Sequence, residues 1–256
     1  MDLGLKDKVV LLTGGSAGIG KAAARLFAEE GAHVVIASRT QETLQQVALE
    51  LRKATGARVE PVVCDIRDPE AIDALLSRAV ALFGGLDVVV NNAGAALPKP
   101  YAEASDQDWH DALGYKLLGY VHTAVKALPY LRARGGGRII NVTGSAGREP
   151  NPWTTSTGIV NAGLGNFTKT LSSQVARDNI LVNAVSPGPI DTGRWSGITG
   201  GQRQAADDLI AQVPLRRLGQ ADEVAAAIVF LASSRASYIT GASLTVDGGR
   251  CNSVSY

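Results

Sequence analysis

Glycines and small polar residues follow the first apolar segment of the chain, and their spacing suits the binding of a phosphate group. The segment reads Thr13-Gly14-Gly15-Ser16-Ala17-Gly18-Ile19-Gly20. Glycine at positions 14, 18 and 20 permits a tight turn, a close approach of the backbone to a pyrophosphate, and close packing of a helix on a strand. The helix that follows offers free N–H groups and the positive end of its dipole. We therefore predict a dinucleotide site with contacts from Gly14, Ser16, Gly18, Ile19 and Gly20.

The residues after the second expected strand indicate which dinucleotide binds. An acidic residue there would bond the ribose hydroxyls and favour NAD, but the sequence has Ser38 and Arg39. A guanidinium pairs with a 2′-phosphate and a hydroxyl donates to it, so we predict NADP(H) in preference to NAD(H). Asp65 and Ile66 follow the third expected strand and suit the edge and the face of an adenine ring. The alternative is a vestigial turn that holds no cofactor.

Composition argues against several other classes of function. The 256 residues include 25 basic and 24 acidic side chains and no long basic run, so neither nucleic acid nor a membrane surface is an expected partner. Two cysteines (Cys64, Cys251) and three histidines (His33, His110, His122) lack the spacing of a metal site. The amino terminus has no signal-peptide pattern, and no apolar run reaches the roughly 18 residues of a membrane span. We expect a cytoplasmic protein without a metal that acts on a small molecule.

Short apolar segments alternate with amphipathic ones along the chain. Apolar runs with little internal alternation predict strands that are buried on both faces of a parallel sheet. Intervening helices of ten or more residues predict right-handed βαβ units. Strands are expected at 9–13, 33–38, 59–64, 86–90, 137–142, 180–186 and 243–246, and helices at 21–30, 41–55, 69–83, 106–134 (one helix or two), 159–177 and 221–231. The expected fold is one α/β domain, residues 1–256, with a doubly wound parallel sheet and helices on both faces.

Further motifs extend the pattern beyond the glycine turn. They are Asp65, Asn91-Asn92-Ala93-Gly94, Val182-Asn183-Ala184-Val185-Ser186-Pro187-Gly188, Tyr238-Ile239-Thr240-Gly241 and Val246-Asp247-Gly248-Gly249. Together with the glycine turn, they make the chain resemble the short-chain dehydrogenase/reductase family over essentially its whole length. The resemblance implies a Rossmann-like fold, a nicotinamide cofactor and usually a tetramer. It places Asn92, Ala93 and Gly94 against the adenosine, and Pro187, Gly188 and Ile190 near the nicotinamide.

The resemblance also implies a catalytic tetrad of Asn, Ser, Tyr and Lys, in which Tyr is the general acid/base and Lys lowers its pKa. The flanking residues put Lys116 at the Asn position, Gly144 at the Ser position, Thr157 at the Tyr position and Asn161 at the Lys position. A shift of register does not restore the tetrad, because no Tyr in the chain is followed four residues later by Lys. Threonine is a poor replacement, since its hydroxyl is far less acidic than a phenol.

Three hypotheses remain open for this site. In the first, an oxidoreductase acts on a carbonyl/alcohol pair through a rebuilt site, where Lys116 and Asn161 exchange the family's Asn and Lys. The second is a catalytically inactive homologue that serves as a structural or regulatory subunit, in a homo-oligomer or beside a catalytic sister subunit. The third is dehydration or isomerisation on the same scaffold. The candidate catalytic residues are Lys116, Tyr115, Ser145, Thr157 and Asn161, with Thr143 and Ser156 as further hydroxyl donors.

The substrate cannot be named from the chain, but its surroundings can be outlined. The stretch 188–204 is expected to be a mobile loop that shapes the substrate pocket. Trp153 and Trp195 flank that region and suit either an apolar lining or packing. Arg148 suits either an anionic substrate group or the surface.

Overall fold

A parallel sheet forms the centre of the molecule. The computed structural model describes residues 1–94, 100–150, 155–193 and 203–253. The strands of the sheet are β1 (Val9–Thr13), β2 (His33–Ser38), β3 (Val59–Val63), β4 (Val88–Asn91), β5 (Gly137–Val142), β6 (Ile180–Pro187) and β9 (Ser243–Val246). Their order is β3-β2-β1-β4-β5-β6-β9, and every neighbouring pair is parallel. Parallel neighbours need crossover connections, which the helices supply.

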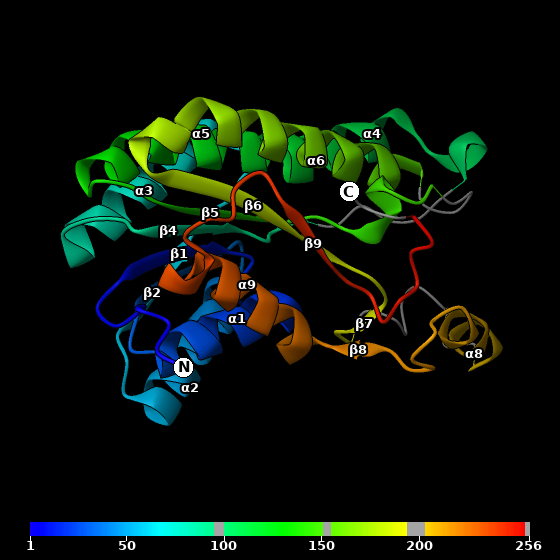
Figure 1. Cartoon of the computed structure of the whole chain (residues 1–256), viewed down its shortest axis with the longest axis horizontal. Helices are drawn as coiled ribbons and strands as arrows, with labels where there is room; N and C mark the ends of the chain where they lie inside the picture. The colour runs from blue at the N-terminus through cyan, green and yellow to red at the C-terminus, as the bar shows by residue number, and fades with distance from the viewer. Residues whose placement is uncertain (95–99, 151–154, 194–202, 254–256) are drawn as a thin grey trace.

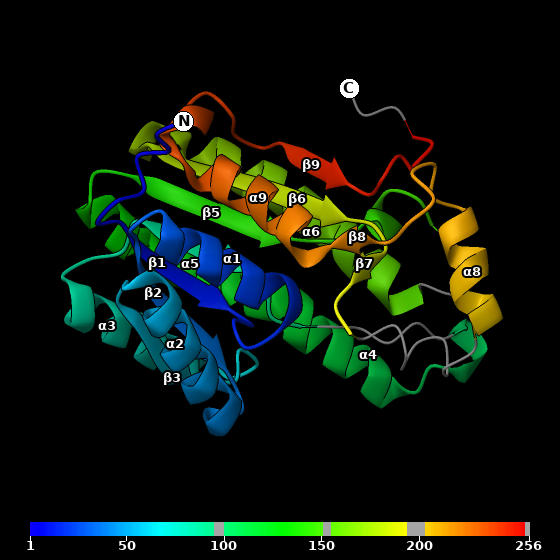
Figure 2. The ribbon, with the colours of Figure 1, turned by 90° about the horizontal axis from the view of Figure 1, so that it is seen from below.

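Helices cover both faces of this sheet. On one face lie α3 (Pro69–Phe83), α5 (Gly119–Ala133) and α6 (Thr155–Val175), and on the other lie α1 (Gly18–Glu29), α2 (Gln41–Thr55) and α9 (Ala221–Ala232) (Figure 1). Figure 2 shows α9 beside α1, although the two helices come from opposite ends of the chain. The doubly wound α/β fold expected from the sequence is confirmed. Within the described ranges, no helix combines the length and the apolar character that crossing a membrane requires.

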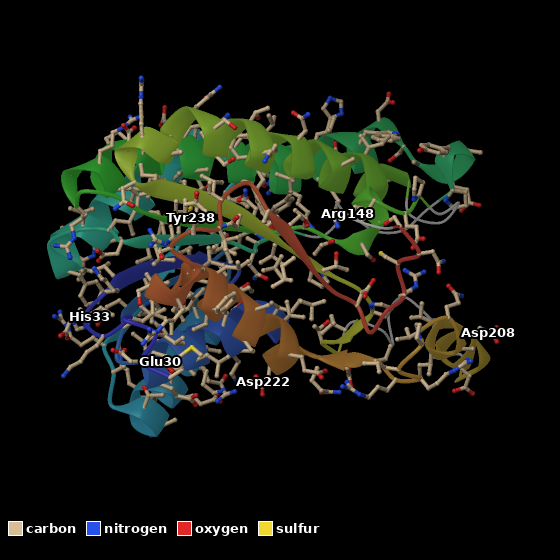
Figure 3. All side chains as sticks on the ribbon, in the orientation of Figure 1. Glu30, His33, Arg148, Asp208, Asp222 and Tyr238 are labelled. Carbon is tan, nitrogen blue, oxygen red and sulfur yellow. The ribbon has the colours of Figure 1, made fainter. Side chains whose placement is uncertain are left out.

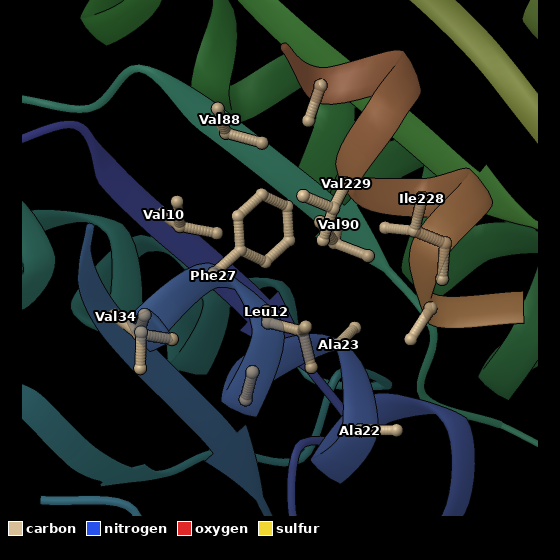
Figure 4. Packing of buried hydrophobic residues seen from close by; sticks show 14 of the residues in the cluster. Val10, Leu12, Ala22, Ala23, Phe27, Val34, Val88, Val90, Ile228 and Val229 are labelled. Carbon is tan, nitrogen blue, oxygen red and sulfur yellow. The ribbon is translucent and has the colours of Figure 1, made fainter. Parts of the chain in front are cut away.

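The core consists of two apolar clusters, one on each face of the sheet. All residues of β1 and β6 are buried, which explains why their sequences show continuous apolar runs rather than alternation. In the first cluster, Phe27 of α1 packs among Val10, Val88 and Val229, which joins the first strand to the last helix (Figure 4). The second cluster includes the fully buried Tyr120 of α5. Burial on both faces therefore fixes the sheet between its helices.

The stretch expected as one or two helices at 106–134 has three parts. They are α4 (Asp106–Ala112), a wider π-helical turn η2 (Leu113–Leu118), and α5. Ser105 and Asp108 form a capping box that starts α4. The apolar pattern carries no sign of η2, because a single widened turn changes the helical period too little to be recognised. Such turns are rare and frequently mark functional sites.

A short strand pair lies beyond the carboxyl end of β6. β7 (Ile190–Asp191) pairs with β8 (Gly219–Gln220), and α8 (Arg203–Ala211) lies between them in the chain. The expectation of a continuous loop at 188–204 is therefore wrong at both of its ends. Two-residue strands show no periodicity, and β7 forms only because a distant segment pairs with it. Residues 194–202 lie outside the described residues, so the mobile loop there stays a prediction.

A buried carboxylate joins the amino ends of β1 and β4. Asp87 accepts hydrogen bonds from the backbone N–H of Val9 at 2.9 Å, from Lys8 Nζ at 3.4 Å, and from Arg134 Nε and Nη2 at 3.3 Å. Its side chain is only 9% exposed. We expect Asp87→Ala to lower the free energy of unfolding by about 2–4 kcal/mol, because the Val9 N–H and both cations lose their partner.

Urea unfolding of the two purified proteins measures this loss. The matched control is Asp73→Ala, which removes an exposed ion pair between Asp73 and Lys126 at 2.6 Å. Exposed pairs contribute little, so the control is expected to stay within about 0.5 kcal/mol of the unsubstituted protein. Equal losses in the two variants would contradict the role given to Asp87.

Candidate active site

The glycine turn lies where the order of the sheet reverses. β1 pairs with β2 on one side and with β4 on the other, and the turn follows β1 directly. Open α/β sheets bind ligands at such a switch point, outside the carboxyl ends of the strands. Thr13 Oγ1 accepts hydrogen bonds from the backbone N–H groups of Asn92 and Ala93, both at 3.1 Å. These bonds hold the segment after β4 against the turn, so two of the predicted cofactor-binding segments are neighbours.

Close packing requires glycine at two positions of the turn. Gly14 has a φ of +71°, and a Cβ there would stand 2.8 Å from Asn92 Nδ2. A Cβ on Gly20 would overlap the carbonyl oxygen of Gly14. The helix α1 begins at Gly18 rather than at residue 21 as expected, because packing overrides the low helix propensity of glycine. Gly18 and Gly20 therefore belong to the first turn of α1.

The start of α1 fits a phosphate group. Ala17 at its N-cap provides no capping side chain, and the first turn contains no acidic residue. By contrast, Asp68 caps α3 and Ser105 caps α4 with side-chain hydrogen bonds. The first N–H groups of α1 have no side-chain cap, and the helix dipole favours an anion there. Together with the glycine cradle, this arrangement fits the pyrophosphate of a dinucleotide.

At the carboxyl end of β2, polar groups are available to a second phosphate. Ser38 Oγ is buried and has no hydrogen-bond partner among the described residues. Arg39 is exposed, and its guanidinium carbon lies 4.7 Å from the ring centroid of Tyr115. An unpaired buried hydroxyl is unfavourable, and a phosphate oxygen would satisfy it. These residues therefore fit the 2′-phosphate predicted from the sequence.

Arg67 lies against the candidate site, and the sequence motifs do not reveal this. Its Nη2 donates to Asp65 Oδ2 at 2.6 Å, and its Nε donates to both carboxylate oxygens at 3.2 and 3.1 Å. These hydrogen bonds hold the pKa of the Asp65 carboxyl below its usual value. Asp65, expected at the adenine edge, thus already has a partner in its own chain, and Ile66 is buried behind it. The spacing of two residues between Asp65 and Arg67 could have indicated this pair. Such a spacing allows an Asx turn, in which Asp65 Oδ1 accepts the backbone N–H of Arg67.

Lys116 extends from η2 toward the end of β5. Its Nζ donates a hydrogen bond to the Thr143 carbonyl oxygen at 2.9 Å, and the residue is only 8% exposed. A Cβ placed on Gly94 would stand 3.4 Å from the Lys116 Cα, so the segment after β4 packs directly on η2. Burying an ammonium group is unfavourable unless hydrogen bonds compensate it. The Thr143 carbonyl therefore helps to fix the position of the amine.

Asn161 approaches the same peptide from α6. A Cβ placed on Gly144 would stand 2.7 Å from Asn161 Nδ2, so the amide occupies space that a larger residue at 144 would need. Asn161 is 4% exposed, and its Oδ1 has no hydrogen-bond partner in the described part of the chain. Lys116 and Asn161 thus converge on the peptide that joins Thr143 to Gly144.

The other candidate hydroxyls lie at two ends of the site. Ser145 begins the turn after Gly144, and Ser156 lies in the first turn of α6; both are buried, and Thr157 is partly buried. Tyr115 belongs to the other end of the site, where its ring lies against the guanidinium of Arg39. Tyr238 is fully exposed before β9 (Figure 3).

The segment after β6 is fixed by the last strand. The Gly188 N–H donates to the Val246 carbonyl oxygen at 3.0 Å, and a Cβ on Gly188 would stand 2.6 Å from Asp247 Cβ. Pro187 ends β6, and Ile190 is buried in β7. Arg148 also turns toward β9, where its Nη1 donates to Thr245 Oγ1 at 3.3 Å (Figure 3). Trp153 and Trp195 lie outside the described residues.

Comparison with known proteins gives consistent matches over the whole chain. A family model described as enoyl-(acyl carrier protein) reductase matches residues 14–250. The 3-oxoacyl-(acyl-carrier-protein) reductase of Thermotoga maritima is 36% identical over 245 residues, which cover 96% of this chain and 98% of that protein. The cis-4-hydroxycyclohexanecarboxylate dehydrogenase of Sinomonas cyclohexanicum is 40% identical over 244 residues, with 95% and 96% coverage. The structure of L-sorbose reductase from Gluconobacter frateurii, complexed with NADPH and L-sorbose, matches with a TM-score of 0.94 at 35% identity, covering 99% of this chain and 100% of that one.

Proposed function

Because the chain belongs to the short-chain dehydrogenase/reductase family of oxidoreductases, we propose that it interconverts a carbonyl compound and its alcohol with NADP(H). The observation that carries the proposal is the meeting of Lys116 and Asn161 at the Thr143–Gly144 peptide. This peptide follows β5, at the same edge of the sheet as the glycine turn. A buried amine beside a proposed dinucleotide site is an arrangement suited to proton transfer.

The choice of NADP(H) is supported by the end of β2. Ser38 offers a buried hydroxyl without a described partner, and Arg39 offers an exposed guanidinium. The L-sorbose reductase that resembles this chain was solved with NADPH. In the proposed complex, the first turn of α1 holds the pyrophosphate, and Ser38 and Arg39 hold the 2′-phosphate.

We propose that Lys116 moves the proton in this reaction. When bound, NADP(H) would supply the hydride-transfer chemistry of either direction. Lys116 Nζ donates one N–H to the Thr143 carbonyl oxygen, and a further N–H gives its proton to the substrate oxygen. An ammonium and a phenol have similar ordinary pKa values, ~10.4 and ~10, so a lysine can hold the proton that a tyrosine holds in relatives. The resulting amine takes up one proton from the solvent, so reduction consumes one proton and one hydride for each alcohol formed.

Asn161 has a binding role in this proposal. Its Oδ1 is buried and accepts no described hydrogen bond, so it is suited to accept one from a ligand hydroxyl. Its Nδ2 occupies the space that a Cβ at residue 144 would need. Asn161 therefore orients a ligand, while Lys116 transfers the proton.

Two measurements test the proposed function. Fluorescence titration should show that the protein binds NADPH at least about tenfold more tightly than NADH, because a charged hydrogen bond to the 2′-phosphate contributes about 1.5–3 kcal/mol. NADPH oxidation should then be followed with a ketose, a cyclic oxo acid and a 3-oxoacyl thioester, and turnover is expected with at least one of them. Binding without turnover of any would favour the inactive-subunit alternative. Absence of binding for both coenzymes would overturn the proposal.

A further inference from the structure

The ring of Tyr115 contacts two guanidinium groups that come from different elements. The guanidinium carbon of Arg39, after β2, lies 4.7 Å from the ring centroid, and that of Arg67, after β3, lies 4.4 Å from it. A cation within about 6 Å of a tyrosine ring is attracted by the negative face of the ring. Tyr115 itself belongs to the π-helical turn η2, directly before Lys116. The ring therefore gathers positive charge at one end of the proposed cofactor site.

The two arginines differ in how their charges are balanced. Arg67 forms ion pairs with Asp65 at 2.6 Å and with Asp111 at 3.5 Å. Arg39 forms no ion pair with any residue that the structure describes; its guanidinium packs on the Tyr115 ring and interacts with the Asp65 carboxylate only as a nearby charge. The Asp65 carboxylate instead accepts its side-chain hydrogen bonds from Arg67. The Tyr115 ring thus contacts two different arginines. The charge of Arg67 is balanced by ion pairs, whereas Arg39 has no ion pair among the described residues.

The guanidinium of Arg39 lies next in the chain to the hydroxyl of Ser38. Ser38 directly precedes Arg39, and its buried Oγ has no partner among the described residues. An exposed arginine loses side-chain entropy when it binds a phosphate, and a ring that already holds the guanidinium lowers this cost. Both guanidinium groups lie over the ring of Tyr115, so the contact is made by its aromatic face and not by its hydroxyl. The aromatic face is therefore the functional part of Tyr115.

We infer that Tyr115 determines coenzyme specificity by positioning Arg39 for the 2′-phosphate of NADP(H). This inference rests on the proposed function, because it presupposes that the site binds this coenzyme. Tyr115 acts through Arg39 and is a positioning residue, not a catalytic one. Its expected signature is a change in the binding of NADPH that is not shared by NADH, which has no 2′-phosphate.

Two substitutions at Tyr115 separate the ring from the hydroxyl. Fluorescence titration is expected to show that Y115L weakens NADPH binding about 3- to 10-fold, the range that a cation–π contact supports. NADH serves as the internal control, and its affinity should change less than about twofold because it makes no contact through Arg39. Y115F keeps the ring and should bind both coenzymes as the unsubstituted protein does. Equal weakening of NADPH and NADH by Y115L, or weakening by Y115F, would overturn the inference.

A double-mutant cycle with Arg39 distinguishes the inference from the function on which it rests. R39A should remove the preference for NADPH, and Y115L combined with R39A should be no weaker than R39A alone, because both act through one contact. If the unsubstituted protein binds NADPH no more tightly than NADH, the proposed NADP(H) preference itself fails, and if R39A leaves NADPH binding unchanged, Arg39 does not hold the 2′-phosphate and the inference is overturned. If R39A weakens NADPH binding and Y115L does not, only the role of Tyr115 is overturned.

Discussion

Replacing Lys116 by methionine is expected to lower kcat for carbonyl reduction by about 10²–10⁴-fold, the usual contribution of a positioned general acid. Methionine preserves the length and apolar stem of a side chain that is only 8% exposed, but it carries no proton. The hydrogen bond to Thr143 is lost as well, without a new charge being buried. Steady-state kinetics with the best substrate of the panel measures the loss. The Kd for NADPH, from fluorescence titration, should stay within about twofold, because the amine acts on the substrate oxygen.

The matched control for this substitution is Lys126→Met. Lys126 lies on α5, ten residues after Lys116, and pairs with Asp73 at 2.6 Å on the surface. Its removal should leave kcat and the Kd for NADPH unchanged, since exposed ion pairs contribute little. Equal turnover in the Lys116 and Lys126 variants would show that Lys116 is not the proton donor. A loss of NADPH binding in the Lys116 variant would instead assign the amine to the cofactor.

Replacing Gly20 by alanine is expected to abolish NADPH binding and to lower the free energy of unfolding by about 1–3 kcal/mol, the usual result of overpacking. The added Cβ would overlap the Gly14 carbonyl oxygen and stand 2.5 Å from Asn92 Nδ2. Neither atom can move easily, because Asn92 Nδ2 donates to the carbonyl oxygens of Thr13 and Gly14 at 3.2 and 3.1 Å. Fluorescence titration and urea unfolding of the variant measure the two effects.

Gly165→Ala provides a control that is expected to raise the free energy of unfolding instead of lowering it. Gly165 lies within α6, and a Cβ there would meet no atom within 4 Å. Alanine in a helix interior is favoured over glycine, so this variant should be more stable by about 0.5–1 kcal/mol and bind NADPH normally. If Gly20→Ala were also stabilising, the close packing of the glycine turn would be refuted.

Much of the fold could be predicted because local signals mark its elements. The bounds of α3 are those expected from the sequence, since Asp68 caps its start, Pro69 suits its first turn, and Gly84 ends it with a φ of +78°. The bounds of α2 are likewise as expected, with Gly56 at its end. The start of α1 was less predictable, because glycines that read as a turn are helical there. Capping and helix-ending residues therefore predict the bounds of a helix where local side chains determine the backbone conformation. They do not predict those bounds where tertiary packing determines it.

The site was predictable only in part for the same reason. The glycine turn could be predicted because a phosphate site needs small residues in a fixed order, and the family resemblance pointed to Asn92, which the structure places against Gly14. The contact of Tyr115 with Arg67 was not, because it joins segments nearly fifty residues apart without a shared motif. The buried positions of Lys116 and Asn161 depend on η2 and α6 meeting the end of β5, which no periodicity shows. The roles given to these side chains remain predictions for the experiments above.

The packing of α9 against α1 has a consequence for the synthesis of the chain. Phe27 and its neighbours in the first core cluster are covered by Val229 and Ile228, which are among the later residues to leave the ribosome (Figure 4). The strands β1 to β5 can pair earlier, since all of them precede residue 143. A nascent chain that ends before Ala221 therefore exposes an apolar face on an otherwise paired sheet, a state prone to aggregation. The first core cluster is therefore completed only after α9 has been synthesised, and until then its apolar face is available to chaperones that shield such surfaces.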